Sequence, residues 1–487
     1  MSSSTLKELV ITGALWAGFE TWATQILSFS IYALLARLVG PTSFGLIALA
    51  GVYLAFIEIF AQQGFGTALI QRKDLQDAHL DSAFWLNLLV AASLTLVTMF
   101  AAGQLALLFG EPRLTEVLRW LSGALILKGL SAIPQAVLER GMAFRALAIR
   151  SLLATLTGGV VGLGMAWGGL GVWSLVGQQL SSAIIGTAVL WWATSWRPSF
   201  HISRSHIRDL YGFSIKNLGN ELLWFGTQRV DQALIGFALG ASALGPYTLA
   251  SRVINISRDF VRAPLETVAL PAFSKIQDER ERLRNAFYKL TEVAGAVTIP
   301  TFFGLAALAP SFVPVIFGAQ WSSSIPLIQI LSLYGLATVP LSFGHPLMIA
   351  VGRPGACLML YVFETCLTIG FCLLAIRWGP VAVACAVSLA MVVYSFVFLA
   401  ACRKFVGISI RVLMSLLWAP TLVAIVMFVA VLVFQASASV RFGAPMTMIA
   451  GSFLGAGIYC AGMVILRPEL LRQLKNDFLS RVTRIAA

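Results

Sequence analysis

Gly40-Pro-Thr-Ser-Phe-Gly-Leu-Ile-Ala-Leu-Ala50 and Gly240-Ala-Ser-Ala-Leu-Gly-Pro-Tyr-Thr-Leu-Ala250 lie 200 residues apart and echo each other. The glycines at the first and sixth positions and the final Leu-Ala are identical in the two stretches. Each stretch follows one long apolar run and opens the next. A repeat of this length in a hydrophobic chain predicts two like halves that face each other across a central path, as in many transporters.

The composition places the chain in a membrane. Hydrophobic residues make up 58% of it, charged residues only 11%, and the mean hydropathy is +0.86, whereas a soluble domain carries about 25% charge. Only helices and closed barrels pair all their backbone polar groups inside lipid. The apolar runs are long and do not alternate as barrel strands do. We therefore expect an all-α polytopic membrane protein.

The apolar runs predict about fourteen spans, at ~20 residues per crossing. Two lobes of six spans are expected at residues 1–200 and 201–411, with two extra helices at 412–466 and a basic cytoplasmic tail at 467–487. Six spans separate equivalent positions, so the repeats are parallel. The expected spans are 10–38, 43–65, 83–109, 117–138, 148–169, 171–195, 211–239, 243–272, 287–310, 325–350, 355–377, 379–402, 412–435 and 445–466.

The distribution of Lys and Arg supports this topology. With the N-terminus in the cytoplasm, 23 basic residues fall on the cytoplasmic side of the fourteen spans and five on the other side, in line with the positive-inside rule. The net charge of +13 therefore mostly reflects the basic residues of the cytoplasmic connections. No nucleic-acid partner is expected. Both termini are predicted to be cytoplasmic.

Charged residues inside the eighth span form one polar stripe. At 100° per residue, Arg252, Arg258, Asp259, Arg262 and Glu266 fall within roughly 120° of arc, with Arg252 close to mid-membrane. Two interpretations remain open. The charges are internal ion pairs that make the helix tolerable, or Arg252 and a second arginine face a central cavity and bind an anionic substrate.

Other polar residues of the spans are further candidates. Lys128, Asn217 and Glu221 are expected to contribute to substrate binding. Arg229 and Asp231, near the outer end of the seventh span, are either a gate pair or an interface anchor. The candidates for coupling to a proton or sodium ion are four carboxylates within spans: Glu20, Glu58, Glu221 and Asp259. Glu292 and Glu364 are weaker candidates.

Several enzyme signatures are absent from the sequence. No Gly-x-x-x-x-Gly-Lys-Ser/Thr loop and no Gly-x-Ser-x-Gly element occurs, so neither an ATPase motor nor a serine hydrolase is indicated. The four histidines form no ligand cluster, so no metal and no cofactor are expected. The protein is not expected to be an enzyme.

The segment after the eighth span resembles a signature of Wzx-type polysaccharide flippases. It reads Leu270-Pro-Ala-Phe-Ser-Lys-Ile-Gln-Asp278 and continues at Leu283-Arg-Asn-Ala-Phe-Tyr-Lys-Leu290. Three more segments resemble the colanic-acid-exporter branch of that family: Gly13-Ala-Leu-Trp16, Phe65-Gly-Thr-Ala-Leu-Ile-Gln-Arg-Lys73 and Phe312-Val-Pro-Val-Ile-Phe-Gly-Ala-Gln-Trp321.

This resemblance implies membership of the multidrug, oligosaccharidyl-lipid and polysaccharide exporter superfamily (MATE/MOP), with two six-helix lobes. It implies that the cargo is an undecaprenyl-diphosphate-linked oligosaccharide, flipped across the bacterial inner membrane for exopolysaccharide, capsule or O-antigen (lipopolysaccharide) synthesis. Related lipid II flippases place arginines on the first span, where this chain has Glu20. The cationic role would then fall on the eighth span and Lys128.

Alternating access by a monomer is the mechanism expected. Its partners would be membrane lipids, a polysaccharide polymerase and chain-length or export proteins. Two alternatives remain open. A multidrug antiporter of the same superfamily would favour an acidic cavity, which the basic stripe opposes. A membrane glycosyltransferase or polysaccharide polymerase would need an outer loop or domain, and the expected outer loops are short.

Overall fold

The computed structural model describes residues 22–62, 69, 76–200 and 204–469, except for the side chains of Gln62, 204–218, 220, 261, 263–268 and 439–442. Helices are the only regular structure in these ranges. The expectation of an all-α protein is confirmed.

The helices follow one another with short connections. A first helix ends at Leu38. The α-helices after it are α2 (Pro41–Gln62), α4 (Asp77–Leu108), α5 (Leu114–Arg140), α6 (Phe144–Trp167), α7 (Val172–Ala193), α8 (Arg204–Lys275), α9 (Arg280–Ile316), α10 (Ser324–Ala337), α11 (Gly344–Ala350), α12 (Pro354–Ala375), α13 (Pro380–Val406) and α14 (Ile410–Leu466).

Two of these helices are broken by a glycine. Gly240 in α8 has φ 77° and ψ −177°, and Gly443 in α14 has φ 70° and ψ 165°. A side chain rarely tolerates such angles. Each glycine therefore divides a long helix into two segments, at the positions where the sequence predicts one span to end and the next to begin.

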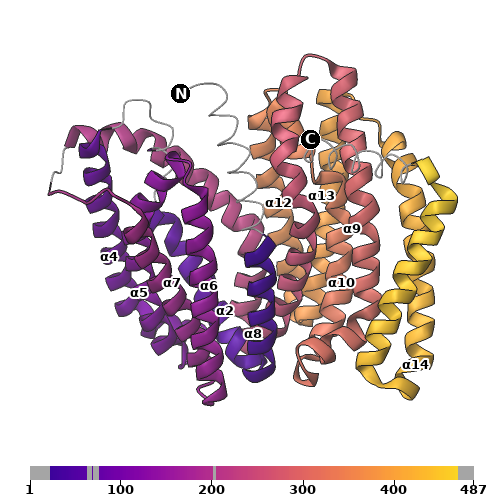
Figure 1. Ribbon diagram of the computed structural model, residues 1–487, viewed down its shortest axis with the longest axis horizontal. Coiled ribbons are helices and arrows are strands. Elements are labelled where there is room, and N and C mark those ends of the chain that lie inside the picture. The colour runs from indigo at the N-terminus through magenta and orange to yellow at the C-terminus, as the bar shows by residue number, and fades with distance from the viewer. Residues whose placement is uncertain (1–21, 63–68, 70–75, 201–203, 470–487) are drawn as a thin grey trace. The chain divides into compact units, whose positions relative to one another are not determined.

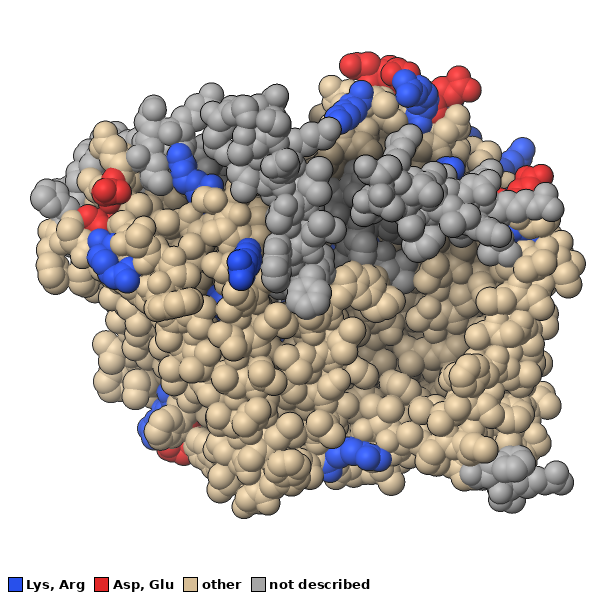
Figure 2. Space-filling model, in the orientation of Figure 1, with Lys and Arg blue, Asp and Glu red and all other residues tan. Residues whose placement is uncertain are grey.

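Eleven helices of the described ranges are long and apolar enough to cross a membrane. One of them, Glu221–Phe260, runs through the Gly240 break and so covers parts of two expected spans. Two further helices correspond to expected spans. The helix that ends at Leu38 lies within the expected span 10–38, and α7 coincides with the expected span 171–195. On the face seen in Figure 2, charged side chains gather toward the helix ends and leave a broad uncharged band between them.

The chain divides into two compact units, an N-terminal unit (Met1–Thr248) and a C-terminal unit (Leu249–Ala487). In the N-terminal unit, α6 packs along α7 and α4 along α5 (Figure 1). In the C-terminal unit, α9 packs along α14 and α10 along α13. The division falls inside α8, near the end of the second echo segment. The lobe limits expected from the sequence, residues 1–200 and 201–411, stay a prediction.

The two echo segments touch each other inside the N-terminal unit. A Cβ atom added to Gly45 would lie 1.8 Å from the carbonyl oxygen of Ala241, and one added to Gly245 would lie 2.1 Å from the carbonyl oxygen of Pro41. The contacts are reciprocal, since each copy presents its second glycine to the residue that follows the first glycine of the other. Backbone therefore meets backbone, with space for hydrogen only.

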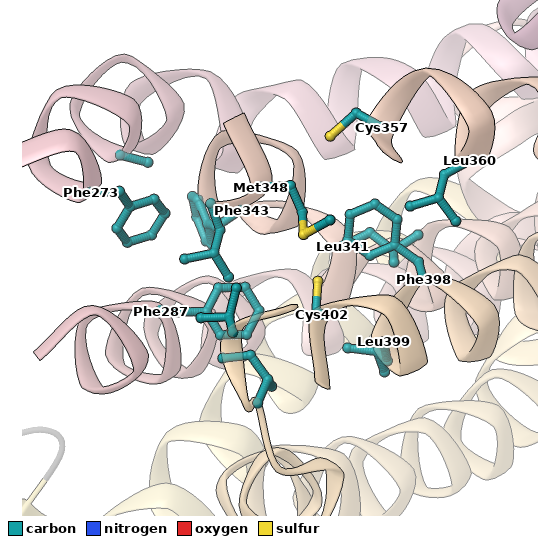
Figure 3. Close-up of a cluster of buried hydrophobic side chains, with 14 of the residues drawn as sticks. Phe273, Phe287, Leu341, Phe343, Met348, Cys357, Leu360, Phe398, Leu399 and Cys402 are labelled. Carbon is teal, nitrogen blue, oxygen red and sulfur yellow. The ribbon is translucent and has the colours of Figure 1, made fainter. Parts of the chain in front are cut away.

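The core of the C-terminal unit is built partly from the 270–290 signature. Phe273 and Phe287 are fully buried there, beside Phe343 and Phe398 (Figure 3). The Tyr288 hydroxyl accepts a hydrogen bond of 2.7 Å from the backbone N–H that precedes α14. The signature thus fixes the turn between α8 and α9 to the rest of the unit.

The reciprocal glycine contact predicts that Gly45→Ala and Gly245→Ala each destabilise the protein by about 1–3 kcal/mol, because the new methyl group meets backbone that cannot move aside. Gly51→Ala is the matched control, since a Cβ there meets nothing within 4 Å. Melting temperatures of the purified proteins in detergent measure the effect. Equal melting of the Gly45 and Gly51 variants would contradict the contact.

The aromatic core predicts a second difference in stability. Phe287→Ala leaves a cavity among fully buried side chains and is expected to cost about 3–5 kcal/mol. Phe396→Ala removes the same atoms from a side chain that is 63% exposed and is expected to change the melting temperature little. A similar loss in both variants would show that burial at Phe287 does not matter.

Candidate functional site

Arg252 lies on the second segment of α8, on an otherwise buried turn. Ser251, Val253 and Ile254 are buried, whereas the Arg252 side chain is exposed. Within the described part of the chain, Arg252 takes part in no hydrogen bond or ion pair. Hydrocarbon does not solvate a guanidinium, so this side chain must face water or a polar partner.

Arg258, two turns further along α8, is held by protein groups. Its side chain is only 10% exposed, and its Nε lies 3.3 Å from Oδ1 of Asp259. It also hydrogen-bonds Tyr334 on α10. Arg258 therefore links α8 to α10, and a substrate would have to compete with these partners for its guanidinium.

The remaining charges of the stripe differ in their surroundings. The Asp259 side chain is 44% exposed. Arg262 is half-buried and acts electrostatically on His345 of α11. The Glu266 side chain lies outside the description. The structure thus separates one exposed arginine, Arg252, from two that interact with other helices.

Sequence reasoning did not foresee a cluster of polar side chains on α11, α12 and α13. The Glu364 carboxylate of α12 accepts a hydrogen bond from the Tyr394 hydroxyl of α13 and interacts electrostatically with Arg258. That hydroxyl also lies 3.3 Å from Nε2 of His345. The His345 ring stacks on Tyr361, with centroids 4.5 Å apart. Glu364 looked weak in the sequence because it is alone on its helix, and no signal there links it to partners on two other helices.

In the N-terminal unit, the structure brings Lys128 and Glu58 together. Lys128 Nζ of α5 lies 2.5 Å from Oε2 of Glu58 on α2, and the two side chains are 45% and 25% exposed. The sequence assigned Lys128 to substrate binding and Glu58 to ion coupling. As neighbours they form one partly exposed ion pair within the spans.

Asp231 and Arg229 make separate contacts. The Asp231 carboxylate accepts a hydrogen bond of 2.5 Å from the Tyr247 hydroxyl, which lies beyond the Gly240 break, in the second echo segment. Arg229 donates to the Gln232 side chain at 3.0 Å. The bond from Tyr247 to Asp231 therefore braces the break between the two segments of α8.

The other candidates are exposed, form an ion pair elsewhere, or lie outside the described residues. Glu221 is exposed. Glu292 of α9 pairs with Arg467 at the end of α14, at 3.5 Å. Glu20 and the side chain of Asn217 lie outside the described residues. Among the residues that are described, no three His, Cys, Asp or Glu side chains gather as metal ligands would.

Long apolar helices with charged groups placed inside them define a multi-pass membrane protein. The chain belongs to the family described as "Polysaccharide biosynthesis protein", whose model matches residues 34–326. The resemblance to Wzx-type flippases is confirmed.

Relatives cover most of the chain. The succinoglycan biosynthesis transport protein ExoT of Rhizobium meliloti (strain 1021) is 30% identical over 69% of this chain and 68% of its own. The lipopolysaccharide biosynthesis protein WzxC of Escherichia coli (strain K12) is 26% identical over 75% and 74%. The teichuronic acid biosynthesis protein TuaB of Bacillus subtilis (strain 168) is 24% identical over 72% of each chain.

Solved structures share the fold. The lipid II flippase MurJ, in an inward closed conformation, aligns with a TM-score of 0.77 and 15% identity over 94% of this chain and 100% of its own. An inward-facing multidrug resistance transporter of the MATE family aligns with a TM-score of 0.58 and 18% identity, over 79% of this chain and 94% of its own.

The Glu58–Lys128 pair predicts a non-additive mutant cycle. Glu58→Gln and Lys128→Met each leave an unpaired charge within the spans, and the double variant removes both charges. We expect a coupling energy of about 0.5–3 kcal/mol, measured from four melting temperatures. The matched control is the exposed pair Glu116–Arg119, with side chains 55% and 46% exposed, where coupling is expected to be small. Additive effects at Glu58 and Lys128 would contradict the pair.

Proposed function

We propose that the protein flips undecaprenyl-diphosphate-linked oligosaccharide repeat units from the inner to the outer leaflet of a bacterial inner membrane, by alternating access. The polymer served is an exopolysaccharide, a capsule or an O-antigen. The family and its named relatives support polysaccharide biosynthesis as the pathway. The fold shared with a lipid II flippase fits a lipid-linked cargo.

Arg252 is the observation that carries this proposal. It lies eleven residues beyond Ala241, the residue after the break, which is about 16 Å along the helix and thus near the middle of a ~30 Å hydrocarbon core. Its guanidinium is exposed and has no described partner. Arginine binds phosphate through paired N–H groups, so this side chain is suited to the diphosphate of the cargo.

We assign further substrate-binding, coupling and gating roles to the other candidate residues. Lys128 offers a second cation, and Asn217 and Glu221 offer polar groups for the sugars. Arg258 and Arg262 remain candidates whose present partners the substrate would displace. Glu20, Glu58 and Asp259 are the proposed coupling carboxylates, and Arg229 and Asp231 the proposed gate. The protein acts as a monomer with both termini in the cytoplasm, beside a polymerase and chain-length or export proteins.

The alternatives fit the structure less well. A multidrug antiporter for cationic drugs would place a carboxylate, not Arg252, at mid-membrane. A glycosyltransferase or polymerase would need catalytic acids on a loop or domain, and the connections between the described helices are short. We infer that the protein transports and does not catalyse.

Arg252→Glu is expected to lower flipping by at least about tenfold, because a hydrogen bond to a charged group contributes about 1.5–3 kcal/mol. Arg252→Lys keeps the charge and should retain part of the rate. Proteoliposomes that carry a fluorescent undecaprenyl-diphosphate-linked oligosaccharide provide the assay. Arg377→Glu, at an exposed helix end, is the control and should flip normally. Wild-type flipping by Arg252→Glu would remove Arg252 from the site.

A further inference from the structure

The span Ser324–Ala350 of the C-terminal unit is not one continuous helix. α10 ends at Ala337, a short 3-10 turn follows at Val339–Leu341, and α11 begins only at Gly344. The 14 residues of α10 and the 7 of α11 measure about 21 Å and about 10 Å. The interruption therefore lies inside a hydrocarbon core of ~30 Å. Interrupted spans of this kind form the polar sites of many transporters.

Two backbone carbonyls at the interruption lack the partner that a continuous helix would give them. The N–H of Leu341 bonds the carbonyl of Thr338, at 3.0 Å, and so leaves that of Ala337. The carbonyl of Ser342 would need the N–H of Pro346, and proline has none. In the described part of the chain, no other donor reaches either carbonyl. Ala337 and Ser342 are both partly exposed. Non-helical backbone that protein does not cover occurs at membrane depth only beside water, so the interruption lines a wet space.

The side chains of this span divide into a packed side and an open side. Leu341, Phe343 and Met348 are buried in the aromatic core of the unit (Figure 3). Between residues 334 and 345, the polar side chains are all partly exposed: Tyr334, Thr338, Ser342 and His345. Their spacing of four, four and three residues is that of one helix face. The open side is therefore a polar row that runs across the interruption.

The polar row lies toward the charged segment of α8, which belongs to the same unit. Tyr334 hydrogen-bonds Arg258, and Arg262 acts electrostatically on His345. Arg258 is six residues beyond Arg252, which is about 9 Å along the helix. A ligand whose phosphate meets Arg252 could therefore extend its next part along the polar row.

The chemistry of the polar row suits a neutral ligand that is rich in hydroxyl groups. The carbonyls of Ala337 and Ser342 can only accept hydrogen bonds, so they repel a phosphate. The hydroxyls of Thr338 and Ser342 donate to backbone carbonyls of their own segment, at 2.7 Å and 3.2 Å, and their oxygens can accept further bonds. Arg258 and Arg262 on the same side oppose a cation. A sugar hydroxyl carries no charge and can donate to all of these acceptors.

We propose that the polar row binds the sugars of the cargo while Arg252 binds its diphosphate. Thr338, Ser342 and the two carbonyls without a described partner accept hydrogen bonds from sugar hydroxyls, and Tyr334 and His345 border them. The hydrogen bonds that the interruption leaves unmade are thus completed by the cargo. This inference rests on the proposed function and names the part of the site that meets the carbohydrate.

The test compares the double variant Thr338→Val/Ser342→Ala with the wild type, each as full-length protein in lipid nanodiscs. Two radiolabelled probes are used, undecaprenyl-diphosphate-linked glucose and undecaprenyl diphosphate without a sugar. We expect the double variant to bind the glucose-linked lipid at least about fivefold more weakly than the wild type, because two hydrogen-bond partners are lost. Its affinity for the sugar-free lipid should equal that of the wild type, which also shows that the variant is folded.

Thr421→Val/Ser437→Ala is the matched control, because these two hydroxyls also donate to the backbone of their own helix, α14. It should bind both probes as the wild type does. An unchanged affinity of the Thr338 and Ser342 double variant for the glucose-linked lipid, or an equal loss for both probes, overturns the inference and leaves the proposed function standing. A loss for both probes that occurs in sodium but not in choline buffer also overturns it, in favour of a cation site. A wild-type protein that binds neither probe refutes the proposed function itself.

Discussion

The core of a bilayer does not solvate charge, and the ionic groups of this chain are arranged accordingly. Glu58 meets Lys128, Asp259 meets Arg258, and Glu292 meets Arg467. Each of these pairs links helices or stabilises one, so pairing alone accounts for its presence. Arg252 stands apart because its guanidinium is exposed and has no described partner. The constraint thus distinguishes charges that have a protein partner from Arg252, which has none among the described residues.

The echo segments show how the same constraint shapes the backbone. A turn between two spans must satisfy its own polar groups in little space. At Gly45 and Gly245 the two turns approach until backbone touches backbone. Beyond the Gly240 break, Tyr247 reaches back to Asp231. A feature that is only a faint repeat in the sequence is, in the structure, a close crossing of two chain segments.

The helical character of the fold and most helix limits could be predicted from the sequence, and the contacts of the candidate site only in part. Helix limits follow from local apolar runs, and the break in α8 follows from Gly240, so both are visible along the chain. The partners of a charged residue are not visible along the chain. Glu58 and Lys128 are 70 residues apart, and Glu364 meets groups on α8 and α13. Nothing in the order of residues states that these helices are neighbours, and so Glu364 seemed isolated.

The 270–290 signature, which carried the resemblance, has its aromatic residues in the core of the C-terminal unit. Phe273 and Phe287 contact other buried side chains and belong to the packing of that unit. The resemblance carried by these two residues therefore reflects shared core packing. Relatives named for succinoglycan, lipopolysaccharide and teichuronic acid synthesis match this chain. A change of cargo would therefore involve residues outside this aromatic core, because side chains buried in it are not available to a ligand.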